Sequence, residues 1–66
     1  MGDYVYRLFY IERGSTTWQH EDFYERTARQ AYYVDNHDNM VMISFAEGDE
    51  DFLPDEPNPH DAERIE

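Results

Sequence analysis

The chain has 66 residues, which is enough for one small domain with a modest hydrophobic core. Sixteen acidic residues stand against five arginines, lysine is absent, and the formal net charge is −11 at pH 7. A surface of this charge repels nucleic acids and anionic membranes and attracts strongly basic proteins. The absence of cysteine excludes disulfides, thiolate zinc sites and a cysteine nucleophile.

Composition also bears on folding and location. The first residues lack the basic and apolar stretches of a signal peptide, and no apolar run approaches the length of a membrane span. With no disulfides to form, we expect a cytoplasmic protein. Six tyrosines, four phenylalanines and one tryptophan favour a folded core over general disorder.

The chain begins with the pattern of a β-hairpin. Tyr4 to Arg13 is rich in aromatic and β-branched residues and contains no glycine or proline, which predicts a long strand. Gly14 can adopt a positive φ and provides the turn. We expect Thr16 to His20 to return antiparallel as the second strand.

A helix is expected next. Asp22 is a favourable N-cap residue, and Glu25 three positions later completes a capping-box pattern. Arg26 and Arg29 lie off the apolar stripe of this helix, so we expect them to pair locally with Glu25 or Asp22. Residues 35–39 are turn formers that end the helix. The stripe that would face the sheet consists of Tyr24, Thr27, Ala28, Ala31 and Tyr32.

A third strand is followed by a strongly acidic end. Met40 to Ala46 alternates in the manner of a half-buried strand. Residues 46–66 then hold nine acids, three prolines and one arginine, whereas residues 1–45 hold seven acids and four arginines. We therefore divide the chain into a ββαβ domain at residues 1–47 and a flexible, disordered acidic tail at residues 48–66. Phe52 and Leu53 lie among these acids, in a solubilising tail or in a short linear motif that folds on binding.

These elements predict an α+β fold. The order strand, strand, helix, strand is satisfied by a three-stranded antiparallel sheet of order 2-1-3, with the helix packed on one face. We assign Tyr6, Leu8 and Tyr10 of the first strand to the helix side, because Arg7 would be costly to bury there.

The opposite face of the first strand would then be open. Val5, Phe9 and Ile11 lie on it, and an exposed apolar patch on a small protein usually marks an interface. Two explanations stay open: contact with a partner or a second copy of the chain, or cover by the chain's own tail.

The acidic side chains are the leading candidates for a binding site. Alternate residues of a strand lie about 6.6 Å apart, and residues one helical turn apart about 5–6 Å, which is of the order of the phosphate repeat in a nucleic-acid strand. A folded acidic face would therefore fit a groove built for DNA or RNA. The candidate partner contacts are Glu47, Asp49, Glu50, Asp51, Asp35, Asp38, Glu21 and Asp22.

Other functions have weaker support. Asp35, His37 and Asn39 alternate but lack the glycine and distal glutamate of an EF-hand loop, so no metal site is expected. No nucleophile with a base and an orienting group is recognisable, so we expect neither enzymatic activity nor a cofactor. Two alternatives to nucleic-acid mimicry stay open: an adaptor module, homodimeric through the open face of the first strand, and a salt-adapted protein with no basic partner.

The plan of residues 4–45, with a hairpin turn at Arg13 and Gly14 and a helix containing Ala28 and Ala31, resembles that of small acidic phage-encoded anti-CRISPR proteins. The resemblance is one of architecture and general character, and it carries over no functional residue by position. It implies a non-enzymatic inhibitor that evades host defence in the host-cell cytoplasm. Its partner would be a basic nucleic-acid-binding protein, a CRISPR effector complex, whose DNA- or RNA-binding channel it would occupy.

Overall fold

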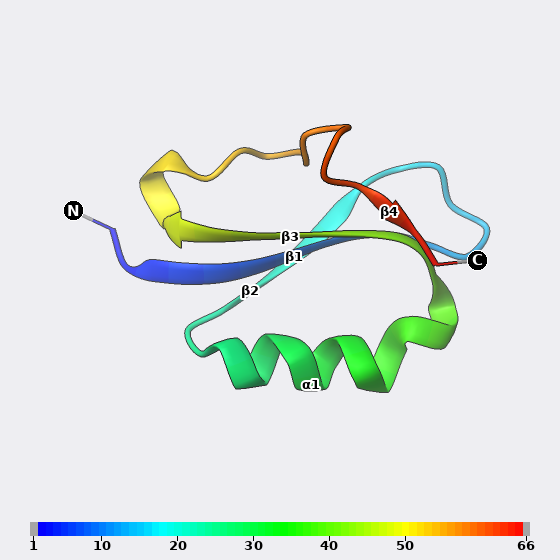
Figure 1. Ribbon diagram of the computed structural model, residues 1–66, viewed down its shortest axis with the longest axis horizontal. Coiled ribbons are helices and arrows are strands. Elements are labelled where there is room, and N and C mark those ends of the chain that lie inside the picture. The colour runs from blue at the N-terminus through cyan, green and yellow to red at the C-terminus, as the bar shows by residue number, and fades with distance from the viewer. Residues whose placement is uncertain (1, 66) are drawn as a thin grey trace.

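A computed structural model describes residues 2–65 of the chain. Its strands pair antiparallel in one sheet of order β2-β1-β3-β4 (Figure 1). Two single-turn 3-10 helices flank β3: η1 (His37–Asn39) and η2 (Glu50–Phe52). The main elements are β1 (Tyr4–Glu12), β2 (Gln19–Phe23), α1 (Arg26–Asn36), β3 (Met40–Asp49) and β4 (Glu63–Arg64).

The predicted α+β class is confirmed, but the sheet has four strands where three were predicted. In the added strand, Arg64 lies opposite Met42, and Ile65 N beyond it donates to Val41 O at 3.1 Å. Sequence reasoning missed β4 because two residues show no periodicity, and the prolines and acids before them are typical of disorder.

β1 is the central strand, and its prediction was wrong only at the last residue, Arg13. The turn after it contains Gly14 at a φ of 87°, a conformation that glycine adopts without strain. Ser15 N donates to Glu12 O at 2.9 Å and closes this turn. β1 pairs along its length with β3 and over five residues with β2, which makes it the scaffold of the molecule.

The other strands extend further into the acidic regions than predicted. β2 occupies Gln19–Phe23 instead of Thr16–His20, so Asp22 is a strand residue and does not cap the helix. The N-cap of α1 is Glu25, which makes no side-chain cap hydrogen bond. β3 continues to Asp49, past its predicted end at Ala46. In each case, pairing with β1 overrides the local turn and capping preferences.

α1 covers one face of the sheet (Figure 1). Leu8 and Tyr10 of β1 form the core on this side with Met40 and Ile43 of β3, as the assignment of β1 side chains predicted. Aromatic rings of α1 and β2 and the side chain of Ile65 complete this cluster.

The C-terminal segment, residues 50–65, crosses the other face before it joins the edge of the sheet as β4 (Figure 1). Val5 and Phe9 are 0% and 1% exposed there. Leu53 lies above Gly48, 3.8 Å from the position that a Cβ would take. Of the two explanations left open for this face, the structure shows cover by the chain itself. The flexibility of residues 48–66 and the division of the chain at residue 47 stay predictions.

Candidate protein-interaction surface

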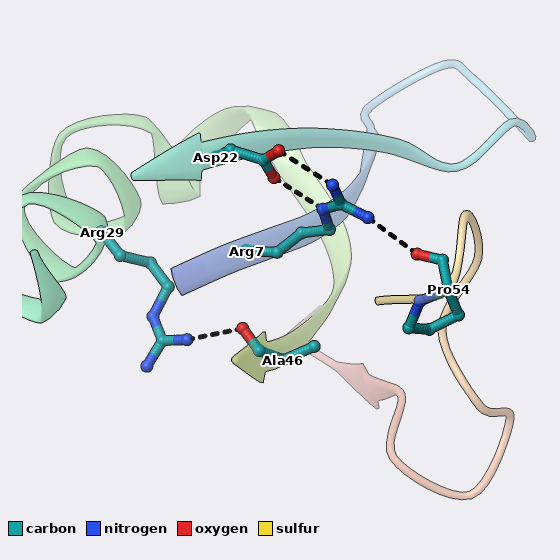
Figure 2. Close-up of polar contacts among 5 residues, drawn as sticks. All are labelled: Arg7, Asp22, Arg29, Ala46 and Pro54. Carbon is teal, nitrogen blue, oxygen red and sulfur yellow. Dashed lines mark hydrogen bonds and ion pairs between the residues drawn. The ribbon is translucent and has the colours of Figure 1, made fainter. Parts of the chain in front are cut away.

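Arg7 is held under the C-terminal segment by three hydrogen bonds (Figure 2). The antiparallel register places it opposite Asp22 on β2. Its Nε and Nη2 donate to the two carboxylate oxygens of Asp22 at 2.6 and 2.8 Å, and its Nη1 donates to Pro54 O at 2.9 Å. The two bonds between Arg7 and Asp22 raise the pKa of Arg7 and hold the pKa of Asp22 below its ordinary value, because they are strongest when both side chains are charged.

Arg29 is buried on the opposite face of the sheet. It reaches from α1 to the end of β3, where Nη1 donates to Ala46 O at 3.0 Å (Figure 2) and Nη2 donates to Glu47 Oε1 at 3.3 Å. Its guanidinium lies 5.4 Å from the ring centre of Tyr6 and 5.1 Å from that of Phe45, distances typical of cation–π contacts.

The predicted apolar stripe of α1 was therefore only partly right: Tyr32 packs against the core and Ala28 is half-buried, but Ala31 is exposed. Tyr24 precedes the helix and is largely exposed, and Thr27 is exposed, whereas Arg29 is buried. The predicted local pairing of Arg26 and Arg29 with Glu25 or Asp22 was also wrong, because both contact the carboxylate of Glu47 on β3. Periodicity counts arginine as polar, whereas hydrogen bonds to Ala46 and Glu47 and the rings of β1 and β3 make a buried position acceptable for Arg29.

Burial of these two arginines removes two of the five positive charges from the surface, each together with an acidic partner. Arg7 and Arg29 are 8% and 7% exposed. Two of the predicted contact acids are engaged by them: Asp22 by Arg7, and Glu47 by Arg29 and, at 3.7 Å, by Arg26. The carboxylates of Asp22 and Glu47 are thus neutralised within the chain.

Three other predicted contacts come together where β3 ends and η2 begins. Asp49 Oδ1 accepts a hydrogen bond from Asp51 N at 3.0 Å, and Glu50 N donates to Asp3 O at 2.9 Å. A Cβ on Gly2 would lie within 2.6–3.1 Å of side-chain atoms of Asp49, Glu50 and Asp51, so the chain start runs directly beside them. We call Asp3, Asp49, Glu50 and Asp51 the acidic tip.

Asp3 was absent from the predicted site, although its place follows from strand pairing. Tyr4 lies opposite Asp49 in the β1–β3 register, which brings the residue before Tyr4 to the end of β3. Because β3 was predicted to end at Ala46, the pairing that brings Asp3 next to Asp49 was not expected. Phe52 follows the tip directly and is 85% exposed, whereas Leu53 packs on the sheet.

The remaining predicted contacts lie away from the tip. Asp35 and Asp38 are exposed near the C-terminal end of α1, at the opposite end of a molecule whose longest dimension is 36 Å (Figure 1). Glu21 lies on β2 and accepts a hydrogen bond from Tyr10 Oη at 3.4 Å. The eight predicted residues therefore do not form one continuous face.

Three further features of the described residues are relevant to function: metal-binding groups, membrane-spanning helices and hollows. Within residues 2–65, no three histidine, aspartate or glutamate side chains are grouped closely enough to hold a metal ion. The helix there is too short and too polar to cross a membrane. A hollow of about 180 Å³ lies between α1 and the end of β1.

Comparison of the chain with protein-family models, with curated proteins and with solved structures finds no match. Its function must therefore be inferred from the charge and geometry of its own residues.

Proposed function

We propose that this chain is a non-enzymatic inhibitor that presents carboxylates in place of phosphates and so blocks the nucleic-acid-binding surface of a basic protein. The observation that carries the proposal is the separation of charge across the molecule. Arg7 and Arg29 are withdrawn into the interior, while nearly all of the acids stay at the surface. Arg13, Arg26 and Arg64 are exposed too, but the exposed acids far outnumber them. The outward field is therefore predominantly negative, and such a field attracts basic grooves over a distance.

The acidic tip is the part of this surface best prepared for contact. Asp49 and Asp51 are tied to each other through the Asp49 carboxylate, and Glu50 is tied through its backbone to Asp3. The Asp49 carboxylate is fixed in this way and loses little conformational entropy on meeting arginine or lysine, and the backbone bonds hold its acidic neighbours close to it. Charge-assisted hydrogen bonds to such cations are stronger than neutral ones.

The exposed ring of Phe52 adds a second kind of contact. A nucleic-acid groove binds phosphates with basic side chains and stacks unpaired bases on flat side chains. Phe52, next to the acidic tip, supplies a flat apolar group beside charges that imitate phosphates. In this proposal the tip and Phe52 form the primary contact, and Asp35, Asp38 and Glu21 extend it.

A CRISPR effector complex is the partner that the resemblance to anti-CRISPR proteins implies. The test is displacement of labelled target DNA from such a complex by the purified chain, followed by fluorescence anisotropy. We expect displacement at low salt that weakens between about 50 and 200 mM salt, since the contact is between opposite charges.

The variant Asp49→Asn/Glu50→Gln/Asp51→Asn should weaken displacement at least tenfold, about 1.4 kcal/mol. Its matched control is Glu56→Gln/Asp61→Asn/Glu63→Gln, which removes the same charge from the C-terminal segment and should retain displacement. Equal losses in both variants would show that only net charge matters. Undisturbed DNA binding at excess wild-type protein would refute mimicry toward that effector.

The adaptor alternative has a structural requirement of its own. Val5 and Phe9, which it would use, are covered by the C-terminal segment. Association through that face therefore requires this segment to move away first.

A further inference from the structure

The hollow at the end of the helix–sheet interface has a lining suited to a cation. β1, α1, η1 and β3 each contribute to it, and it lies far from the acidic tip. Its walls combine two tyrosine rings, one carboxylate and two side-chain amides. The lining residues are Tyr10, Glu12, Tyr32, Asn36, Asn39 and Met40.

The lining of this hollow carries one negative charge, that of Glu12, and Arg13 lies next to it in the chain. Glu12 is exposed at its edge, and its Oε1 accepts a hydrogen bond from Gln19 Nε2 at 2.7 Å. Burial, a hydrogen bond with Tyr32 and the nearby charges of Glu21 and Glu12 together raise the pKa of Tyr10, so its ring stays neutral. No basic residue lies in the last turn of α1, whose C-terminal end carries the negative pole of the helix dipole.

One amide of the lining, that of Asn36, has its oxygen left as an acceptor, because its Nδ2 donates to Tyr32 O at 2.9 Å. The rings of Tyr10 and Tyr32 are inclined at 46° with centres 6.3 Å apart, so they form an angled aromatic wall. Planar cations bind such walls through their faces and bind carboxylates through their edges.

The size of the hollow limits its occupant. A volume of about 180 Å³ is well below that of pockets for drug-sized ligands, about 300–1,000 Å³. It corresponds to roughly six water molecules at about 30 Å³ each, which suits the end of one side chain. The guanidinium of Arg13 is engaged by the backbone of η1 next to the hollow, where its Nη2 donates to Asp38 O at 2.9 Å.

We propose that this hollow receives the guanidinium of an arginine side chain presented by the basic partner, with Glu12 as its counterion and Tyr10 and Tyr32 as its aromatic wall. This inference rests on the proposed function for the identity of the partner. It adds a second anchor at the end of the molecule opposite the acidic tip. Lysine fits less well, because its compact ammonium makes no edge-on pair with a carboxylate and no stacked contact with a ring.

The test is an NMR titration of the ¹⁵N-labelled full chain with N-acetyl-arginine amide as the probe. N-acetyl-citrulline amide, which has the same shape without the charge, is the first control, and N-acetyl-lysine amide is the second. We expect saturable shifts at the side-chain amides of Asn36 and Asn39, with at least tenfold weaker binding of the citrulline probe. Glu12→Gln should weaken arginine binding about fivefold, and Glu63→Gln, with the same net charge, should not.

Equal shifts with arginine and citrulline probes would overturn the inference. So would arginine shifts spread evenly over all acidic residues, or equal effects of Glu12→Gln and Glu63→Gln. The titration needs no effector complex, so its outcome is independent of the competition assay. If arginine binds in the hollow but the chain does not displace DNA, the arginine site is supported and the proposed function is refuted. If the chain displaces DNA but arginine does not bind in the hollow, the proposed function is supported and the arginine site is refuted.

Discussion

At the scale of single residues, Arg7 and Arg29 show two ways of burying the same cation. Arg7 forms a bidentate ion pair with a carboxylate and a hydrogen bond to a backbone carbonyl. Arg29 donates to a backbone carbonyl and to one carboxylate oxygen and lies against two aromatic rings. A buried charge is tolerated only when it is paired and hydrogen-bonded. Loss of the carboxylate partner should therefore cost more than loss of a surface ion pair.

Replacement of Asp22 by Asn should lower the free energy of unfolding by about 1–3 kcal/mol at neutral pH, because Arg7 stays buried without its counterion. Arg7 holds the folded-state pKa of Asp22 below its unfolded value, which is about 3.9. The pair therefore stabilises the fold above about pH 4 and loses this contribution as the pH falls through the lower, folded pKa.

Denaturant unfolding at pH 7, 5 and 3 measures this effect. The difference between wild type and Asp22→Asn should be steady between about pH 7 and 5 and should shrink below about pH 4. Glu25→Gln is the control, because the side chain of Glu25 makes no cap hydrogen bond. A difference between wild type and Asp22→Asn that persists unchanged at pH 3 would contradict the assigned ion pair.

At the scale of elements, the C-terminal segment has the role that a second helix or sheet has in larger domains. It closes the face of β1 that α1 leaves open, through Leu53 above Gly48 and through Pro54 O on Arg7. β4 then fixes the end of the segment to β3. A small domain gains apolar burial on both faces of its sheet in this way.

Removal of residues 53–66 should therefore lower the free energy of unfolding by roughly 3 kcal/mol or more, since Val5 and Phe9 lose their cover. The exposed face should also drive self-association. Thermal unfolding and light scattering after size exclusion measure the two effects. Phe9→Ser in the shortened chain should reduce the association. A shortened chain that is monomeric and as stable as the full chain would disprove the covering role.

Much of this architecture was predictable from local patterns, and the rest was not. β1 is apolar or aromatic at every position except Arg7 and Glu12, so its extent and its place inside the sheet could be predicted. β2 has no such pattern, because four of its five residues are exposed, and only pairing with β1 makes it a strand. β4 owes its existence to β3 in the same way.

The candidate site also has a part that local sequence predicts and a part that depends on long-range pairing. The grouping of Asp49, Glu50 and Asp51 follows from their adjacency in sequence, so it could be predicted. The neutralisation of Asp22 and Glu47 depends on the strand register and on a helix residue reaching across the sheet, which no local pattern reveals. Asp3 joins the tip for the same reason, through the pairing of β1 with β3.

At the scale of the whole molecule, net charge opposes folding. Exposed acids repel one another across a small surface, and salt screens them with a Debye length of about 10 Å at 0.1 M. The repulsion acts against a sheet with apolar cover on both faces, so the protein should be folded at low salt.

We expect the melting temperature to rise by roughly 5 °C between low and molar sodium chloride, because screening contributes about 1 kcal/mol in a chain of this length. Circular dichroism at 20 mM salt should already show the folded spectrum. The salt-adapted alternative expects an unfolded chain there that folds only when salt is added. That result would favour a salt-adapted protein with no basic partner over a nucleic-acid mimic.

The two borders of the sheet have a consequence for behaviour at high concentration. On one side β2 presents polar side chains, Glu21 and Asp22 among them, and on the other β4 is only two residues long. Neither border is a flat apolar template onto which a strand of another copy could add. Carboxylates proposed to attract a foreign groove thus also keep sister molecules from stacking into fibrils.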